Sequence, residues 1–220
     1  MSEPAPSWAR PSPATFGSHG FDVALISRNR TRLHELVGTL TAEDITAAAF
    51  PADVLDREAL TQALRRAATH FGGIDVLEYS PLGGLGSTTL TTPADTDPSH
   101  VQQELEFQLY AAITATRAVL PAMREAGTGT LLFTTGARSV DPQPPTADIN
   151  AAAAAPRNWA INLHKELAGT RTQAAHAGID ATNDTPTFYG RARVTADQIA
   201  RVHWDLHTTH RDEAERIFRG

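Results

Sequence analysis

Hydrophobic positions follow two alternating patterns along this chain from Phe21 onward. Short runs of β-branched or apolar residues alternate with longer segments in which apolar residues recur every three or four positions. The short runs are typical of buried strands, and the longer periodicity is typical of helices that cover a sheet. The short runs predict strands at residues 22–27, 45–50, 76–80, 129–135 and 172–178.

Helices are predicted between and after these strands. Strands that alternate with helices are the pattern of a parallel sheet with helices on its faces. We therefore expect an α/β fold with a Rossmann-like, doubly wound parallel sheet. Three apolar helix faces support this expectation: Leu60, Leu64, Ala68 and Phe71; Val101, Leu105, Leu109, Ile113, Val119 and Met123; and Ile199, Val202, Leu206 and Ile217.

The length and the N-terminal composition predict the domain organisation. A chain of 220 residues with 41% hydrophobic residues can bury one sizeable core. The first 19 residues carry prolines at positions 4, 6, 11 and 13, no strand-like run, and no glycine before Gly17. We expect an irregular proline-rich arm over residues 1–19 and a single domain over residues 20–220.

Charge and composition exclude several classes of partner. The formal net charge is -6 and the arginines are scattered, which argues against binding to a nucleic-acid backbone. The chain has no cysteine, no apolar N-terminal signal and no run of about 18 apolar residues. These observations predict a cytoplasmic protein without disulfides and without a nucleic-acid or membrane partner.

Four segments, in order, resemble the short-chain dehydrogenase/reductase family. GFDVALISRN is similar to the family's second strand, and FPADVLD to its third strand and the following acid. GGIDVLEYSP is similar to its fourth strand, and ITATRAVLPAMREAGTGTLLFTTGA to its long helix and fifth strand. The resemblance runs from about Gly20 to Leu167 and implies the Rossmann-like fold, whereas a fold alone leaves the chemistry open.

The family's first strand and glycine-rich turn have no clear counterpart. That turn lets the backbone approach the pyrophosphate of a dinucleotide at a helix N-terminus. Aligned backwards from Gly17, the glycine positions fall on Ala5, Ser7 and Ala9, whose side chains would crowd a pyrophosphate. We expect a degenerate or missing first strand, whose place the arm fills irregularly or a partner chain fills.

Other cofactor contacts of the family are retained in the alignment. Ser27-Arg28-Asn29 resembles the family's reader of a 2′-phosphate, which an arginine binds by a charge-assisted bond, and Asp53-Val54 resembles its adenine clamp. Alternatively, Arg28 and Arg30 begin a solvated helix, and Asp53 is an ordinary loop acid. We expect no cofactor, or NADP if a dinucleotide binds, and the candidate cofactor-binding residues are Ser27, Arg28, Asn29, Asp53 and Val54.

The catalytic positions implied by the resemblance carry different residues. With Arg157-Asn158-Trp159 as anchor, the tyrosine and lysine of the family's YxxxK motif become Ile149 and Ala153, which cannot titrate. The asparagine and serine positions become Gln108 and Gly136. Ordinary ketone reduction is therefore not expected.

Two further lysine and proline positions bear on this region. Lys165 is the only lysine in the chain and Ile161 stands four residues before it, so a shifted alignment does not restore the motif. Pro156 is tolerated in the first turn of a helix and not in its interior. We expect this helix to begin near Ala155, with a remodelled turn before it.

Polar residues at or after the carboxyl ends of the strands form a candidate cleft, because ligands of open α/β sheets bind there. Glu78 or Asp148 can act as a base, and Tyr79 or Arg138 can stabilise an oxyanion. The alternative is that these loop residues pair with one another. The candidate catalytic residues are Glu78, Tyr79, Arg138 and Asp148, and the candidate substrate-cleft residues are Gln108, Thr135 and Asn150.

Three histidines near the C-terminus share one predicted helical face. His203, His207 and His210 have the spacing for this, but no carboxylate that would orient them is readable. We expect a surface or interface face here and no metal site.

Two predicted helices correspond to those through which the family usually dimerises, namely 101–124 and the alanine-rich helix after Pro156. Their small side chains would let helices approach closely. We expect a homodimer or homotetramer, with a hetero-oligomer with an intact homologue as a further alternative. The small residues are Ala111, Ala112, Ala115 and Ala160.

Three functional hypotheses follow. The first is a family member repurposed for non-redox chemistry on a small molecule, such as a cyclisation, isomerisation or elimination. The second is a catalytically silent pseudoenzyme that serves as a partner subunit. The third is a residual NADP-dependent oxidoreductase that uses unfamiliar residues.

Overall fold

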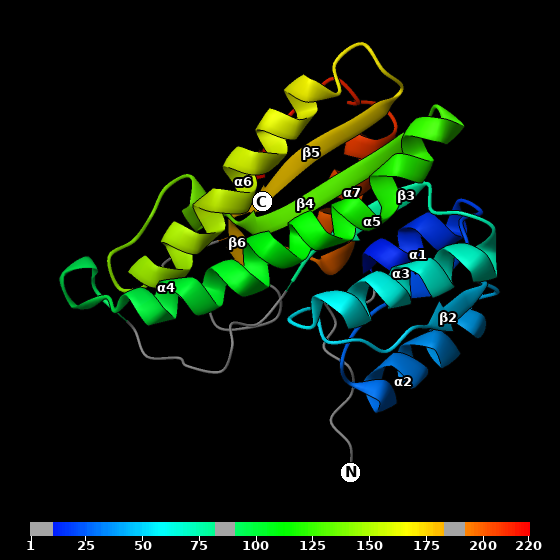
Figure 1. The fold of residues 1–220 in the computed structure, drawn as a ribbon, viewed down its shortest axis with the longest axis horizontal. Helices are drawn as coiled ribbons and strands as arrows, with labels where there is room; N and C mark the ends of the chain where they lie inside the picture. The colour runs from blue at the N-terminus through cyan, green and yellow to red at the C-terminus, as the bar shows by residue number, and fades with distance from the viewer. Residues whose placement is uncertain (1–10, 82–90, 183–191) are drawn as a thin grey trace.

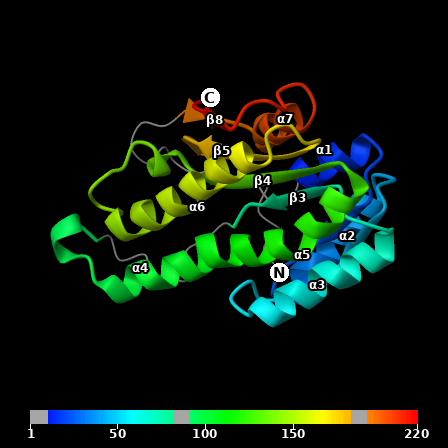
Figure 2. The same ribbon diagram turned by 45° about the horizontal axis from the view of Figure 1, so that its top comes forward.

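Parallel strands lie between two layers of helices in the computed structural model, which describes residues 11–81, 91–182 and 192–220 (Figure 1). Helices α5 and α6 cover the near face of strands β4 and β5 in this view, and α7 lies behind them. The turned view shows α1 beside α7, far from α5 and α6 (Figure 2). This arrangement is the expected Rossmann-like α/β fold.

The strands form three parallel sheets. The largest has the order β3-β4-β5-β8, while β1 pairs with β2 and β6 pairs with β7. The five predicted strands are present with ends that differ by a few residues. The bounds are β1 Val23–Leu25, β2 Ala47–Ala49, β3 Val76–Tyr79, β4 Gly129–Gly136, β5 Thr172–Ile179, β6 Ala181–Thr182, β7 Ala192–Arg193 and β8 Glu215–Phe218.

The helices begin and end at residues that stabilise helix termini. The Asp56 side chain accepts hydrogen bonds from the amides of Glu58 and Ala59 at the start of α3, and Gly72 ends this helix with φ 84°. The α-helices are α1 Pro11–Ser18, α2 Arg30–Thr41, α3 Arg57–Phe71, α4 Pro98–Leu105, α5 Ala111–Ala126, α6 Ala147–Glu166 and α7 Ala196–His207; a π-helical segment, Glu106–Tyr110, joins α4 to α5, and short 3-10 turns occur at Pro93–Asp95 and Ala137–Ser139.

Apolar side chains fill both faces of the large sheet. On one face α3, α5 and α6 pack against alternate residues of β3 and β4, such as Leu77, Leu131 and Phe133. On the other face α1 and α7 pack against Leu132 and neighbouring residues of β5. Ala111, Ala112, Ala115 and Ala160 are buried within this chain. Their expected place on a dimer surface is therefore wrong, because they bring α5 and α6 close to the chain's own sheet.

Helix α6 begins at Ala147, so the expected start near Ala155 is wrong. Pro156 lies inside the helix, where it cannot donate a hydrogen bond to the carbonyl of Ala152. The helix continues because its alanine face is buried against the sheet, which offsets the lost bond. Pro121 is accommodated in α5 in the same way.

Two other expectations at the ends of the chain are corrected. Residues 11–18 form α1, where an irregular arm was expected; prolines are tolerated in its first turn, and Phe16 packs between α1 and α7. Residues 1–10 lie outside the described part. Ile217 belongs to β8 and not to the last helix, because α7 ends at His207.

The strands on either side of the expected first-strand position are not paired with each other. Strand β1 is hydrogen-bonded to β2, and β3 to β4, but no described strand joins β1 to β3. A cavity occupies this position and is part of the candidate site. Within the described ranges, no helix is long and apolar enough to cross a membrane.

Candidate functional site

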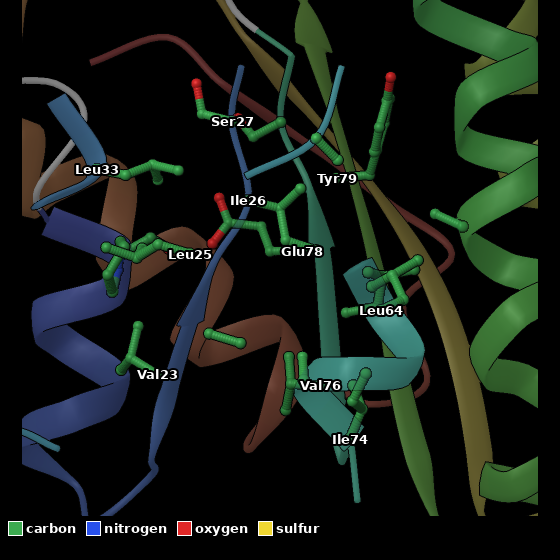
Figure 3. Close-up of a pocket in the computed structure, with 18 of the residues that line it drawn as sticks. Val23, Leu25, Ile26, Ser27, Leu33, Leu64, Ile74, Val76, Glu78 and Tyr79 are labelled. Carbon is green, nitrogen blue, oxygen red and sulfur yellow. The ribbon is translucent and has the colours of Figure 1, made fainter. Parts of the chain in front are cut away.

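A cavity of about 890 Å³ lies between β1 and β3 (Figure 3). Residues Val23 to Ser27 run along one wall and Ile74 to Tyr79 along the other, in the same direction. Its volume is in the range of small-molecule sites. The cavity gathers all five candidate cofactor residues and two of the candidate catalytic residues: Ser27, Arg28, Asn29, Asp53, Val54, Glu78 and Tyr79.

The candidate cofactor residues lie where β1 and β2 end. Arg28 is exposed, and its Nη1 lies 4.0 Å from Oδ2 of Asp53, an ion pair that water screens. Asn29 caps α2, with its Oδ1 accepting a hydrogen bond of 3.0 Å from the amide of Arg32. The N-terminus of α2 and the Arg28 guanidinium therefore present positive charge on the same edge of the cavity.

Glu78 connects the cavity to a buried histidine. Its Oε1 lies 3.4 Å from Nδ1 of His203. The same ring is held by Oγ of Ser12 at 2.8 Å and by Oγ1 of Thr134 at 2.8 Å. These contacts order the ring beneath the cavity floor.

Tyr79 is committed to the protein backbone. Its hydroxyl donates a hydrogen bond of 2.5 Å to the carbonyl of Phe107, inside the π-helical segment. Burial raises the pKa of this phenol well above its usual value. The hydroxyl anchors a π turn, a feature often found at functional sites, and the expected role as an oxyanion donor is not supported by this geometry.

A second polar group lies on the other face of the sheet, at the carboxyl ends of β4 and β5. Oγ1 of Thr135 lies 2.8 Å from Nε2 of His176 and 2.9 Å from Oγ of Ser139. Nδ1 of His176 lies 3.0 Å from Oε1 of Glu215. Arg157 in α6 binds both oxygens of this carboxylate. We call Thr135, His176 and Glu215 the proton relay.

The charges within the proton relay follow from its surroundings. Burial lowers the pKa of His176 to about 4, although Glu215 opposes this shift. Burial acts to raise the pKa of Glu215, but Arg157 and then His176 lower it on balance. At neutral pH the imidazole is uncharged. Its Nδ1 then carries the proton that the carboxylate accepts, and Nε2 is left to accept from the Thr135 hydroxyl.

Several expected cleft residues are bound within their own segments. Nδ2 of Asn150 donates to the carbonyl of Gln143, and Nε2 of Gln108 donates to Glu104. Asp148 is buried and accepts from the amide of Ile149. Among the described residues that line the cavity, none of the following is found: Gln108, Thr135, Arg138, Asp148 and Asn150.

The four positions aligned with the family's catalytic residues lie around the proton relay. Gly136 follows Thr135 at the end of β4. Ile149 and Ala153 lie on α6, the helix that also carries Arg157. Gln108 lies in the π-helical segment.

The three C-terminal histidines do not converge. His203 is 2% exposed, so the expected surface face is wrong for it, because Ser12, Thr134 and Glu78 surround its ring. Nδ1 of His207 contacts Thr130, and Nδ1 of His210 contacts Glu213. The described residues contain no group of three histidine, cysteine or acidic side chains placed to hold a metal ion.

Sequence reasoning missed His176 and Glu215. Their only local signal is a single histidine within an otherwise small and apolar strand, TQAAHAGI. A buried polar side chain in such a strand requires partners, but the sequence does not say which residues supply them.

Comparisons with known proteins identify the family. A family model described as short chain dehydrogenase matches residues 13–188. An uncharacterized oxidoreductase of Staphylococcus aureus (strain MRSA252) is 26% identical over 171 residues, which cover 77% of this chain and 71% of that protein. The chain therefore belongs to the short chain dehydrogenase family.

Solved structures share the fold. The chain is similar to L-sorbose reductase from Gluconobacter frateurii, solved with NADPH and L-sorbose, with a TM-score of 0.82 at 18% identity, covering 94% of this chain and 89% of that one. A metagenomic short-chain oxidoreductase in complex with NADP gives a TM-score of 0.80 at 19% identity, with 97% and 91% covered.

Proposed function

We propose that this chain is an NADP-dependent oxidoreductase that interconverts a small carbonyl compound and its alcohol. The observation that carries the proposal is the proton relay, which offers a hydroxyl backed by a neutral imidazole and a carboxylate at the carboxyl ends of two central strands. The name of the staphylococcal relative and the NADPH and NADP in the two similar structures support the same class. This replaces the expectation of a protein without cofactor.

The residues around the cavity suit the adenosine end of NADP. Arg28 offers an exposed guanidinium for a 2′-phosphate, and Asp53 and Val54 line the wall next to it. Without a ligand phosphate, Arg28 has only a long ion pair, which leaves its donors accessible to an anion. When bound, the nicotinamide supplies or accepts the hydride.

The proton relay moves the proton that accompanies the hydride. Thr135 is 9% exposed and His176 is fully buried, so a substrate oxygen reaches the imidazole only through the threonine hydroxyl. In alcohol oxidation the substrate hydroxyl gives its proton to Oγ1 of Thr135, whose own proton passes to Nε2 of His176. Glu215 then faces an imidazolium, which its charge stabilises. In carbonyl reduction the same protons move in the opposite direction.

A second candidate is non-redox acid–base chemistry, such as an isomerisation, cyclisation or elimination. The observation that favours it is Ile149 and Ala153 at the aligned tyrosine and lysine positions, which removes the residues that the family uses beside the nicotinamide. The same proton relay can transfer protons without a hydride. In that case no cofactor is consumed.

Deuteride transfer distinguishes the two candidates. The purified chain is incubated with NADPH deuterated at the transferable position and a set of small ketones and aldehydes, and the products are analysed by mass spectrometry. The proposal predicts alcohols that are one mass unit heavier, formed by the wild type and by Thr135→Ser but not by Thr135→Val. Conversion of a carbonyl compound without label and without cofactor would favour the second candidate instead.

A further inference from the structure

The cavity between β1 and β3 has the features of a site for an additional β-strand. We call this cavity the strand slot. Strand β1 is paired only on its β2 side and β3 only on its β4 side among the described strands. Two strand edges thus face one another across a cavity of about 890 Å³. Unpaired edges of this kind are templates for another strand.

The backbone of β1 turns alternate residues toward the strand slot. The amide of Val23 donates to the carbonyl of Thr46, and the carbonyl of Leu25 accepts from Phe50, so both residues face β2. Successive residues of a strand present their backbone groups to opposite sides. The amides and carbonyls of Ala24 and Ile26 therefore face the strand slot.

The same reasoning applies to β3. The carbonyl of Asp75 accepts from the amide of Thr130 next to β4, so Asp75 and Leu77 face β4. The backbone groups of Val76 and Glu78 consequently face the strand slot. Both edges offer the donors and acceptors that a strand between them would use.

Apolar side chains around the strand slot are incompletely covered. Ala24 is exposed, and Ile26 and Val76 are only half-buried, although they belong to strands inside an α/β domain. Leu33 of α2 lies on one side of the cavity and Leu64 of α3 on the other. A strand in this position would be covered on both faces, and such strands are continuously apolar.

Charges at the two ends set the direction of the occupant. Asp22 and Asp75 precede β1 and β3 and line the cavity at the amino end of both strands. Arg28 and Arg32 line its other end. A segment parallel to β1 and β3 that begins with a basic residue matches this distribution of charge.

The N-terminal residues of this chain are a poor match. The sequence of residues 1–10 is MSEPAPSWAR, with prolines at positions 4 and 6. Proline has no amide to donate, and residues two apart in a strand face the same neighbour, so one edge would lose both bonds. Glu3 would also bring an acid where a basic residue fits.

We propose that the strand slot binds an extended segment of another polypeptide by β-strand addition. The segment runs parallel to β1 and β3, is apolar on both faces, lacks proline and begins with a basic residue. This inference is independent of the redox function, because it concerns backbone pairing without cofactor.

Amide hydrogen exchange on the full, isotope-labelled chain tests the proposal, with the capped peptide KVAVVTG as probe. The expected result is that exchange of the amides of Ala24, Ile26, Val76 and Glu78 slows by about tenfold or more. The amides of Leu25 and Leu77, which already face β2 and β4, change little. Two control peptides, one N-methylated at alternate amides and one beginning with glutamate, protect less.

A matched variant tests the direction of binding. Asp22→Asn combined with Asp75→Asn is expected to reduce the preference for the lysine peptide over the glutamate peptide. The proposal is overturned if the four slot-facing amides are already protected in the free chain, which would assign the site to the chain itself. It is also overturned if protection rises with protein concentration alone, or if millimolar peptide leaves all four amides unprotected.

Discussion

His176 and Glu215 are direct neighbours across β5 and β8, and Nδ1 of the imidazole lies 3.0 Å from Oε1 of the carboxylate. Arg157 binds the same carboxylate from α6, and Thr135 contacts the other ring nitrogen from β4. One charged pair therefore joins three elements of the fold to the hydroxyl at the candidate site. Its removal should affect both stability and proton transfer.

The stability of the fold should depend on the protonation of His176. Burial holds its pKa at about 4 in the folded chain, below the usual 6.5, so the unfolded chain takes up the proton first as pH falls. The contribution of neutral His176 is complete above pH 6.5 and is lost as pH falls toward 4, up to about 3 kcal/mol. Urea unfolding at several pH values measures it.

The control for this measurement is His176→Asn, compared by the slope of unfolding free energy against pH and not by its absolute stability. The slope between pH 6.5 and 4.5 should become shallower in the variant. Some slope should remain, because burial also lowers the pKa of His207. An unchanged slope would show that His176 is not the titrating group.

Thr135→Val should separate proton transfer from cofactor binding. The valine keeps the shape and removes the hydroxyl that contacts Nε2 of His176, so kcat should fall about a hundredfold or more. The affinity for NADPH should stay unchanged, because Thr135 is not among the described residues that line the cavity. Thr135→Ser should retain much of the activity and the same pH profile. Equal kcat for valine and wild type would exclude the proton relay from the reaction.

Tyr79→Phe should act mainly on stability. The variant loses the hydrogen bond to the Phe107 carbonyl and leaves that group unpaired in the π-helical segment, at a cost of about 1–3 kcal/mol. Its kcat should fall much less than that of Thr135→Val. A large loss of kcat with an unchanged unfolding midpoint would instead identify Tyr79 as the group that handles the proton.

The strands and the cofactor-side residues were predictable because their signals are local. The apolar runs before Ser27 and Tyr79 define β1 and β3, and residues that follow parallel strands meet at one edge of a sheet. Asp56 likewise caps α3 through contacts within three residues. Such features need no knowledge of distant parts of the chain.

The proton relay could not be predicted, because its contacts span 39 to 58 residues. Glu215 reads as part of a charged C-terminal tail until β8 pairs with β5 and brings it to His176. Pro156 misled for the opposite reason, since a local rule for helix starts was overridden by burial of the alanine face of α6. Tertiary packing decided both cases.

Calorimetric titration of NADPH into the wild type, Arg28→Ala and Arg30→Ala, with NADH as comparison, tests the central claim most directly. Arg28 lines the cavity, whereas Arg30 begins α2 outside its described lining and serves as the control. We predict that NADPH binds more tightly than NADH, and that Arg28→Ala weakens NADPH about tenfold or more while Arg30→Ala does not. Absence of NADPH binding at millimolar concentration, or equal binding by all three proteins, would contradict the account.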